Sequence, residues 1–271
     1  MSAHTPHTLL AESGCHIKAD CAFPAPGLHS FDFKPIFSVG SFDFTKPMLL
    51  AMICMLLVVG FFWAAFNKPK LVPGKMQLVG EIGYNFVARS IAREVIGKKG
   101  DKYVPFLTSI FFFVWIMNVM SIVPFAQFPA MARFAFPVAL AALVFITYMY
   151  LTFKTHGFRG GVKNLVWIEG LPKPLVPLIV LLEFIQNVIT RPFTLAVRLW
   201  ANMFAGHMLI VMFSVATWYL LTPTILTAVS AGSFVLAAGM TAFEILIQFL
   251  QAYIFTLLAS IYISGALEEG H

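Results

Sequence analysis

Five long apolar runs restrict the fold of this sequence more than any other feature. They cover residues 47–66, 103–125, 135–153, 175–221 and 225–266. A helix rises about 1.5 Å per residue and the hydrocarbon core of a bilayer is about 30 Å thick, so about 20 apolar residues suffice for one crossing. Because 59% of the residues are hydrophobic and only 11% are charged, a soluble domain is excluded. The sequence predicts an all-α polytopic membrane protein whose surroundings are a lipid bilayer.

The last two runs are too long for one perpendicular crossing. Each exceeds 40 residues, which is on the order of 60 Å of helix. Each run is therefore either a bent hairpin with two crossings or a single, steeply tilted helix. Only residues 221–224, Leu-Thr-Pro-Thr, separate the two runs, and such a short turn makes them an antiparallel pair. We expect about five to six transmembrane helices, and the residues alone leave hairpin and tilt open.

Lys and Arg residues orient the chain, because they concentrate in cytoplasmic loops. Eight lie in 67–102, four lie in 154–174, and only Arg133 lies in the loop between them. With five crossings, this places the C-terminus in the cytoplasm and the polar N-terminal tail, 1–46, outside. The membrane domain is then 47–271. Residues 76–100 are either an interfacial helix or a soluble basic loop. The net charge of +6 reports this topology, so we expect no nucleic-acid partner.

Ionisable side chains inside the apolar runs mark the candidate site. A charged group at membrane depth costs roughly 2.5 to 3.5 kcal/mol on insertion scales, so it normally has a function. Five such residues lie in the last two runs: Glu183, Arg191, Arg198, His207 and Glu244. Their uncharged companions are Asn187, Asn202, Gln248 and Gln251. At about 100° per residue, Glu244, Gln248 and Gln251 share one helix face, as do Arg198 and Asn202.

These side chains differ in what they can do with a proton. An arginine stays protonated and acts only as a fixed charge, which favours the ionised form of a nearby carboxylate. Glu183, His207 and Glu244 can titrate. Simpler interpretations remain open: Arg191 extends to the membrane interface, His207 is a packing residue, and Arg198 forms a structural ion pair with Glu183 or Glu244.

Catalytic and metal-binding motifs are missing from the sequence. The segment 97–100, Gly-Lys-Lys-Gly, is too short for a nucleotide-binding loop, so we expect no ATP chemistry in this chain. Cys15, Cys21 and Cys54 do not have the spacing of a zinc finger. A disulfide between Cys15 and Cys21 would form only if the tail faces an oxidising space. We therefore expect no metal, no cofactor and no enzymatic activity of the chain by itself.

Several motifs then give the sequence a family resemblance. They are Val72–Lys75 (VPGK), Trp115–Met120 (WIMNVM) with Pro124, Leu182-Glu183, Leu195–Gly206 (LAVRLWANMFAG) and Gln251–Phe255 (QAYIF). In this order they resemble subunit a of bacterial F-type ATP synthases, from about residue 45 to the C-terminus. The first 45 residues are not covered by the resemblance.

The resemblance implies a role for each matched position. Arg198 would be the essential arginine that faces the rotating ring of c subunits, with Asn202 and Gln251 at other functional positions. It also implies that the two long regions are steeply tilted helices beside that ring, and that the b subunits of the peripheral stalk and the rest of the ATP synthase are partners. Many bacterial members have Glu at the position of His207 and His at that of Glu244, so these two residues are exchanged here.

The expected function is that of a proton-translocating stator subunit in the inner (plasma) membrane. The resemblance implies two aqueous half-channels that meet at the ring on opposite sides of Arg198. Protons would enter from outside past Glu244, His207 and Glu183, protonate a ring carboxylate and leave to the cytoplasm after rotation. The alternative is an ion-coupled secondary transporter, which would also place Glu, His and Arg at the midplane but would bind a solute and need no rotor.

Overall fold

The computed structural model describes residues 37–39, 42–123, 129–166, 176–221 and 225–267. Most of the predicted tail, including Cys15 and Cys21, lies outside these residues. The described part of the tail contains two short antiparallel strands, β1 (Phe37–Val39) and β2 (Phe42–Phe44), with Phe37 opposite Phe44. From Lys46 onward the described elements are helices, so the all-α class is confirmed.

The predicted spans agree closely with the helices. Among the described residues, five helical segments are long and apolar enough to cross a membrane: Lys46–Phe66, Lys75–Val119, Ala135–Lys163, Val176–Tyr219 and Leu226–Leu267. The first is α1 (Lys46–Phe66), and the third lies in α5 (Ala135–Val166). Helix α5 extends beyond the predicted end at residue 153, and its backbone leaves the helical conformation at Gly157, where φ is 69°. Glycine adopts this conformation without a steric penalty.

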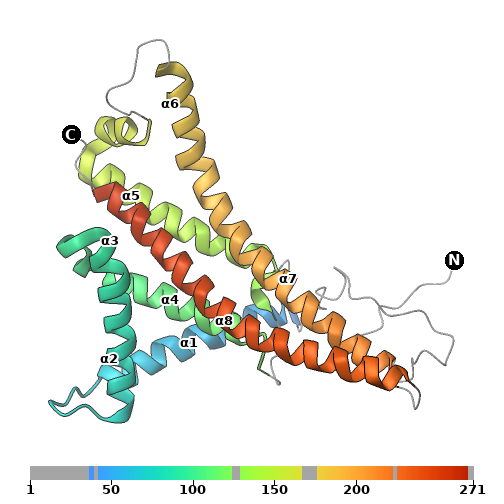
Figure 1. Cartoon of the computed structure of the whole chain (residues 1–271). Coiled ribbons are helices and arrows are strands. Elements are labelled where there is room, and N and C mark those ends of the chain that lie inside the picture. Colours follow the sequence, from blue (N-terminus) through green and yellow to red (C-terminus); the bar gives the residue numbers. More distant parts are fainter. Residues whose placement is uncertain (1–36, 40–41, 124–128, 167–175, 222–224, 268–271) are drawn as a thin grey trace.

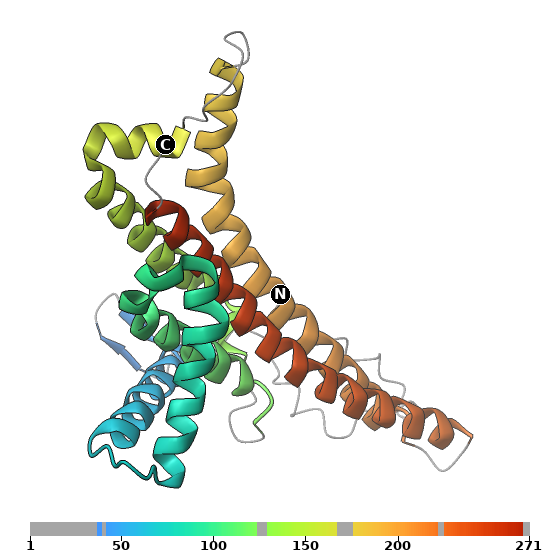
Figure 2. The ribbon, with the colours of Figure 1, turned by 60° about the vertical axis from the view of Figure 1, so that its left-hand side comes forward.

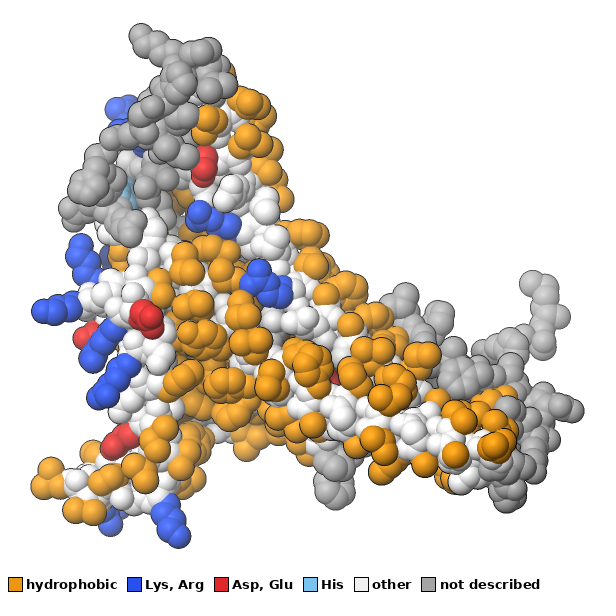
Figure 3. All heavy atoms as spheres, viewed as in Figure 1, with side chains coloured by type: hydrophobic (Ala, Val, Ile, Leu, Met, Phe, Trp, Pro, Cys, Tyr) orange, Lys and Arg blue, Asp and Glu red, His pale blue; other side chains and the backbone are white. Residues whose placement is uncertain are grey.

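Residues 75–119 form a bent helical segment rather than a loop and a span. It consists of α2 (Lys75–Val87), the π-helix η3 (Ala88–Arg93), α3 (Glu94–Ile96), the 3-10 helix η4 (Gly97–Tyr103) and α4 (Val104–Val119). In Figure 1, α2 and α3 run across α1 and α4 instead of alongside them. Lys and Arg side chains gather along this edge in Figure 3. The soluble-loop interpretation of 76–100 is therefore wrong, and the arrangement favours an interfacial helix.

The core lies where α4 and α5 meet the two long C-terminal helices. Its largest buried side chains include Phe111 of α4 and Phe255, which are 2% and 1% exposed. Phe86 of α2 extends this core, because its ring contacts those of Phe111, Phe249 and Tyr253. Helix α1, in contrast, exposes large apolar side chains such as Leu56 and Trp63. Such a face suits lipid.

The two long C-terminal regions are single helices, so the hairpin alternative is wrong. One runs without interruption through α6 (Val176–Ile185), the π-helix η7 (Gln186–Thr190) and α7 (Arg191–Tyr219); the other is α8 (Leu226–Leu267). Figures 1 and 2 show α7 and α8 side by side, with α6 diverging from the end of α8. Asn202 contacts Gln251, and Thr217 contacts Ser230. Residue numbers rise on one helix as they fall on the other, which confirms the antiparallel pair.

Candidate functional site

Arg198 lies on the outward face of α7. The exposed residues Arg198, Asn202, Ala205, Leu209 and Met212 recur every three or four positions and so form one stripe along the helix. We call these five residues the α7 stripe. A neighbouring face of α7, which contains Leu195, Leu199 and Met203, is buried in the core. This apolar periodicity fixes the rotation of α7 and directs the arginine away from the chain.

No ion pair neutralises Arg198 within the chain, as far as the described residues show. Its predicted partners Glu183 and Glu244 both belong to the described part, and neither forms a salt bridge with it. The structural ion pair considered for Arg198 is therefore not found. A charged group at the surface of a membrane-spanning helix needs a partner, and the position of Arg198 allows that partner to come from another chain.

Asn202 connects the α7 stripe to α8. Its side-chain Nδ2 donates a hydrogen bond of 2.8 Å to Oε1 of Gln251. Gln251 is only 4% exposed, so the bond joins an exposed residue to a buried one. The structure thus joins Asn202 to Gln251, and Arg198 lies one helical turn from this bond.

Glu244 is buried against α7 at Gly206. It is 4% exposed, and a Cβ atom at Gly206 would lie 3.2 Å from its Cδ. The missing side chain of Gly206 therefore makes room for the carboxyl group. His207 follows directly on α7 and is partly buried. The structure places the two exchanged residues at neighbouring levels of the α7–α8 pair.

Gln248 and Ser121 also lie beside Glu244, although the sequence does not predict that they form a pair. Gln248 Nε2 lies 3.3 Å from Glu244 Oε1 and 2.9 Å from Oγ of Ser121, at the end of α4. Serine is common in membrane helices, and 127 positions separate the residues. The sequence contains no signal that could have paired them.

Glu183 lies far from Glu244 and His207. It precedes His207 by 24 positions on one continuous helix, which corresponds to about 36 Å. Its Oε2 accepts a 3.2 Å hydrogen bond from Asn187, whose Nδ2 also donates to the Leu165 carbonyl of α5 at 2.6 Å. The structure therefore does not bring the three titratable residues together.

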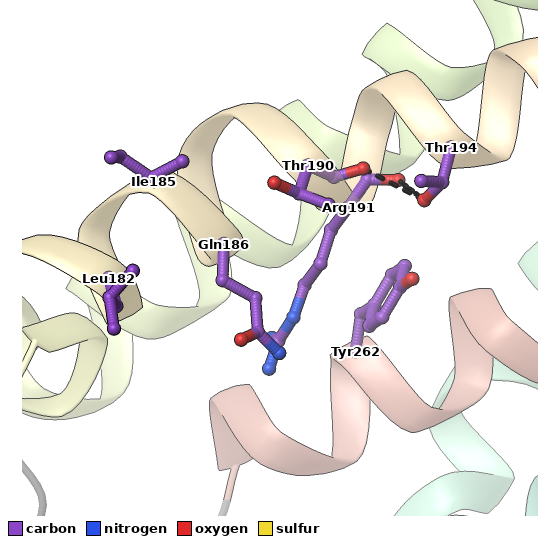
Figure 4. A pocket seen from close by; sticks show the side chains of 7 residues that line it. All are labelled: Leu182, Ile185, Gln186, Thr190, Arg191, Thr194 and Tyr262. Atoms are coloured by element: carbon purple, nitrogen blue, oxygen red, sulfur yellow. Dashed lines mark hydrogen bonds between the residues drawn. The ribbon is translucent and has the colours of Figure 1, made fainter. Parts of the chain in front are cut away.

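A hollow of about 580 Å³ opens between η7, the start of α7 and α8. Figure 4 shows the side chains of Gln186 and Arg191 reaching across it toward α8. The guanidinium carbon of Arg191 lies 5.2 Å from the ring centre of Tyr262, a cation–π distance. Its lining residues are Leu182, Ile185, Gln186, Thr190, Arg191, Thr194 and Tyr262. The four-residue spacing of Gln186, Thr190 and Thr194 is the signal that could have predicted this polar face.

Comparison with known proteins identifies the family. Residues 48–264 match the family model described as ATP synthase A chain. The chain belongs to this family. It is 51% identical to ATP synthase subunit a of Streptomyces lividans over 276 residues, which cover 100% of the chain and 97% of that protein. It is 41% identical to ATP synthase subunit a of Rhodococcus erythropolis over 250 residues, 90% of each protein. Membership of the ATP synthase A chain family confirms the expected class, a non-catalytic, proton-translocating stator subunit.

The contact between Gly206 and Glu244 gives a first prediction. Gly206→Val places a branched side chain where a single Cβ would already lie 3.2 Å from the Glu244 Cδ, so the carboxyl group must move. We expect ATP-driven proton pumping to fall at least about tenfold, the order of effect of misplacing a reacting group. Gly60→Val on α1 is the matched control, because no side chain or other helix of the described part of the chain lies within 4 Å of a Cβ there. Equal pumping by both variants in inverted membrane vesicles would contradict the importance of this contact.

Proposed function

We propose that Arg198 is the charge that separates two half-channels, through which this chain delivers protons to a ring of c subunits and receives them back. The observation that carries the proposal is the outward position of Arg198 on the α7 stripe. Polar groups lie along the α7–α8 pair on either side of Arg198: Glu244 of α8 and His207 of α7 in one direction, and the hollow beside Arg191 in the other.

The uptake side contains Glu244 and His207. These residues lie between Arg198 and the 221–224 turn, which the distribution of Lys and Arg places outside. Glu244 is a buried carboxyl group beside Gly206, and both side chains can gain and lose a proton. They would transfer protons from outside to a ring carboxylate.

The release side contains Glu183 and the hollow. Both lie between Arg198 and the segment 154–174, which has four Lys and Arg residues and is assigned to the cytoplasm. The separation of about 36 Å from His207 therefore favours a release role for Glu183, which revises the expectation that protons enter past it. Gln186, Thr190 and Thr194 provide polar groups along the hollow.

Arg198 itself would carry no proton. Its guanidinium remains charged at any physiological pH, so a proton cannot pass through its position. A ring carboxylate that arrives beside it is favoured in the ionised form and so releases its proton. Because each half-channel ends at the ring, protons cross only when the ring turns. The membrane potential supplies about 2.3 kcal/mol per charge per 100 mV to bias the rotation.

The proposed setting is an ATP synthase in the inner (plasma) membrane. The ring of c subunits would lie against the α7 stripe, and the b subunits of the peripheral stalk would hold the chain in place while the ring turns. The tail 1–46 would lie outside, and the membrane domain 47–271 would end in the cytoplasm, as the basic loops indicate. Arg89 and Lys98, exposed at the α2–α3 edge, would then face cytoplasmic lipid headgroups.

Reconstitution into vesicles distinguishes this function from that of a secondary transporter. Vesicles that contain the chain together with the c ring and the peripheral stalk should conduct protons when a potential is applied. The chain alone should conduct none, because neither half-channel crosses the membrane. Proton movement by the chain alone, coupled to a solute gradient, would overturn the proposal and favour the transporter.

A further inference from the structure

A hydrogen-bonded chain of buried side chains joins α4 to Glu244. Oγ of Ser121 donates to the Asn118 backbone carbonyl at 2.8 Å, and Gln248 Nε2 lies 2.9 Å from the same Oγ. Nε2 also lies 3.3 Å from Glu244 Oε1. Ser121 and Glu244 are each 4% exposed and Gln248 is 2% exposed, so the chain of bonds is shielded from the surroundings.

The chemistry of these groups fixes the direction of each bond. A hydroxyl has one hydrogen, and that of Ser121 is directed at the Asn118 carbonyl, so Oγ can only accept from Gln248. The Gln248 atom that faces Ser121 must therefore be the NH2 group. Its second hydrogen then points to Glu244 Oε1. Gln248 thus presents a donor to one chosen carboxyl oxygen, anchored from a different helix.

The two oxygens of Glu244 consequently differ. Oε1 accepts from Gln248 and is also the oxygen closest to Gly206, 3.3 Å from a Cβ placed there. Oε2 is buried and has no hydrogen-bond partner among the described residues. The acidic hydrogen of the carboxyl group is less favourable on an oxygen that already accepts from an amide, because it would lie close to the hydrogen of the amide donor. It is therefore more favourable on Oε2 than on Oε1.

We propose that Gln248, anchored by Ser121, is a positioning residue that holds Glu244 so that Oε2 alone takes up and releases the proton. This deepens the proposed function and rests on it. No proton passes through Gln248, since an amide does not titrate in this range. Its effect is to hold the carboxyl in one orientation, so that each proton arrives at and leaves from the same atom.

The groups around Glu244 allow a changed pH response to be assigned to Gln248. Helix α4 and the turn after it contribute the uncharged Asn118 and Ser121, and α7 contributes Gly206 with His207 next to it. His207 is the titratable group that α7 brings to this level. Variants of Gln248 and Ser121 leave it and Glu244 unchanged, so a changed pH response would arise from the lost hydrogen bonds.

The test is Gln248→Met in the whole ATP synthase, because methionine has nearly the same length and no donor. We expect proton pumping in inverted vesicles to fall about fivefold to tenfold, the usual effect of losing one intramolecular hydrogen bond. We also expect the pH at which passive proton flux is half-maximal to move to a higher value, because a donor favours the ionised carboxyl. Thr241→Val is the control, since among the described residues the Thr241 hydroxyl bonds its own helix alone, at the Ala237 carbonyl.

Ser121→Ala completes the test and covers a failure of Gln248→Met to assemble. Alone, it should move the pH profile in the same direction by a smaller amount, because the donor loses its anchor. Added to Gln248→Met, it should cause no further loss. Equal loss at every pH, additive effects, or an unchanged profile would overturn the proposal. Normal pumping by Gln248→Met beside an inactive Glu244→Gln would refute this inference alone and leave the proposed function intact.

Discussion

Replacing Arg198 by alanine is expected to abolish ATP-driven proton pumping while the complex still assembles. The guanidinium projects from the α7 stripe and forms no salt bridge with Glu183 or Glu244, so its loss leaves the packing of the described residues unchanged. Opposite charges about 4 Å apart interact by about 4 kcal/mol near a protein surface, and 1.4 kcal/mol is tenfold. We therefore expect a loss of about a hundredfold or more, measured as acidification of inverted vesicles.

The controls separate the position of the charge from its mere presence. Arg89→Ala removes another exposed arginine, from η3, and should pump normally. Arg198→Lys keeps a positive charge without the planar guanidinium and should retain partial activity. ATP hydrolysis and subunit content must be checked in the same membranes. Coupled pumping at the normal rate by Arg198→Ala would refute the role of this residue.

Glu244→Gln should cause the second-largest loss. Glutamine has the same shape and still accepts a hydrogen bond from Gln248, so the packing beside Gly206 is preserved, but an amide cannot take up or release the proton. We expect pumping to fall at least about tenfold, in the range of removing a proton-transfer group. Glu81→Gln is the matched control, because Glu81 is a partly buried carboxylate of α2 that accepts a 2.7 Å bond from Gln77.

The pH dependence distinguishes this loss from a packing defect. A defect in packing would lower proton flux by the same factor at every pH, whereas loss of a titrating group should also remove one step from the pH profile of passive flux. A Glu244→Gln complex with the normal rate and the normal profile would show that Glu244 is only a packing residue.

The helices could be predicted from the sequence because apolar length is a strong signal. The predicted run 225–266 corresponds to α8, Leu226–Leu267, and the run 47–66 corresponds to α1, Lys46–Phe66. Length alone could not decide between hairpin and single helix in the fourth run, because both bury the same apolar residues. The distance between Glu183 and His207 depends on that choice. A hairpin would bring Glu183 back toward His207, whereas the continuous helix separates them by about 36 Å.

The candidate site was predictable where its residues share a helix face. Arg198 and Asn202 are four apart, and Glu244, Gln248 and Gln251 follow one stripe of α8, as the helical period requires. The contacts between helices were not predictable in this way. Ser121 reaches Gln248 only because α4 ends beside α8, a consequence of packing among several helices.

The most direct test of the account is photo-cross-linking from the α7 stripe. A benzophenone side chain at Leu209, which is 41% exposed on the same face as Arg198, is compared with one at Leu56 of α1, which is 69% exposed. The account predicts that irradiation joins Leu209, and not Leu56, to a c subunit and stops ATP-driven pumping. Adducts with c subunits from Leu56 and none from Leu209 would show that the ring lies elsewhere and that Arg198 does not face it.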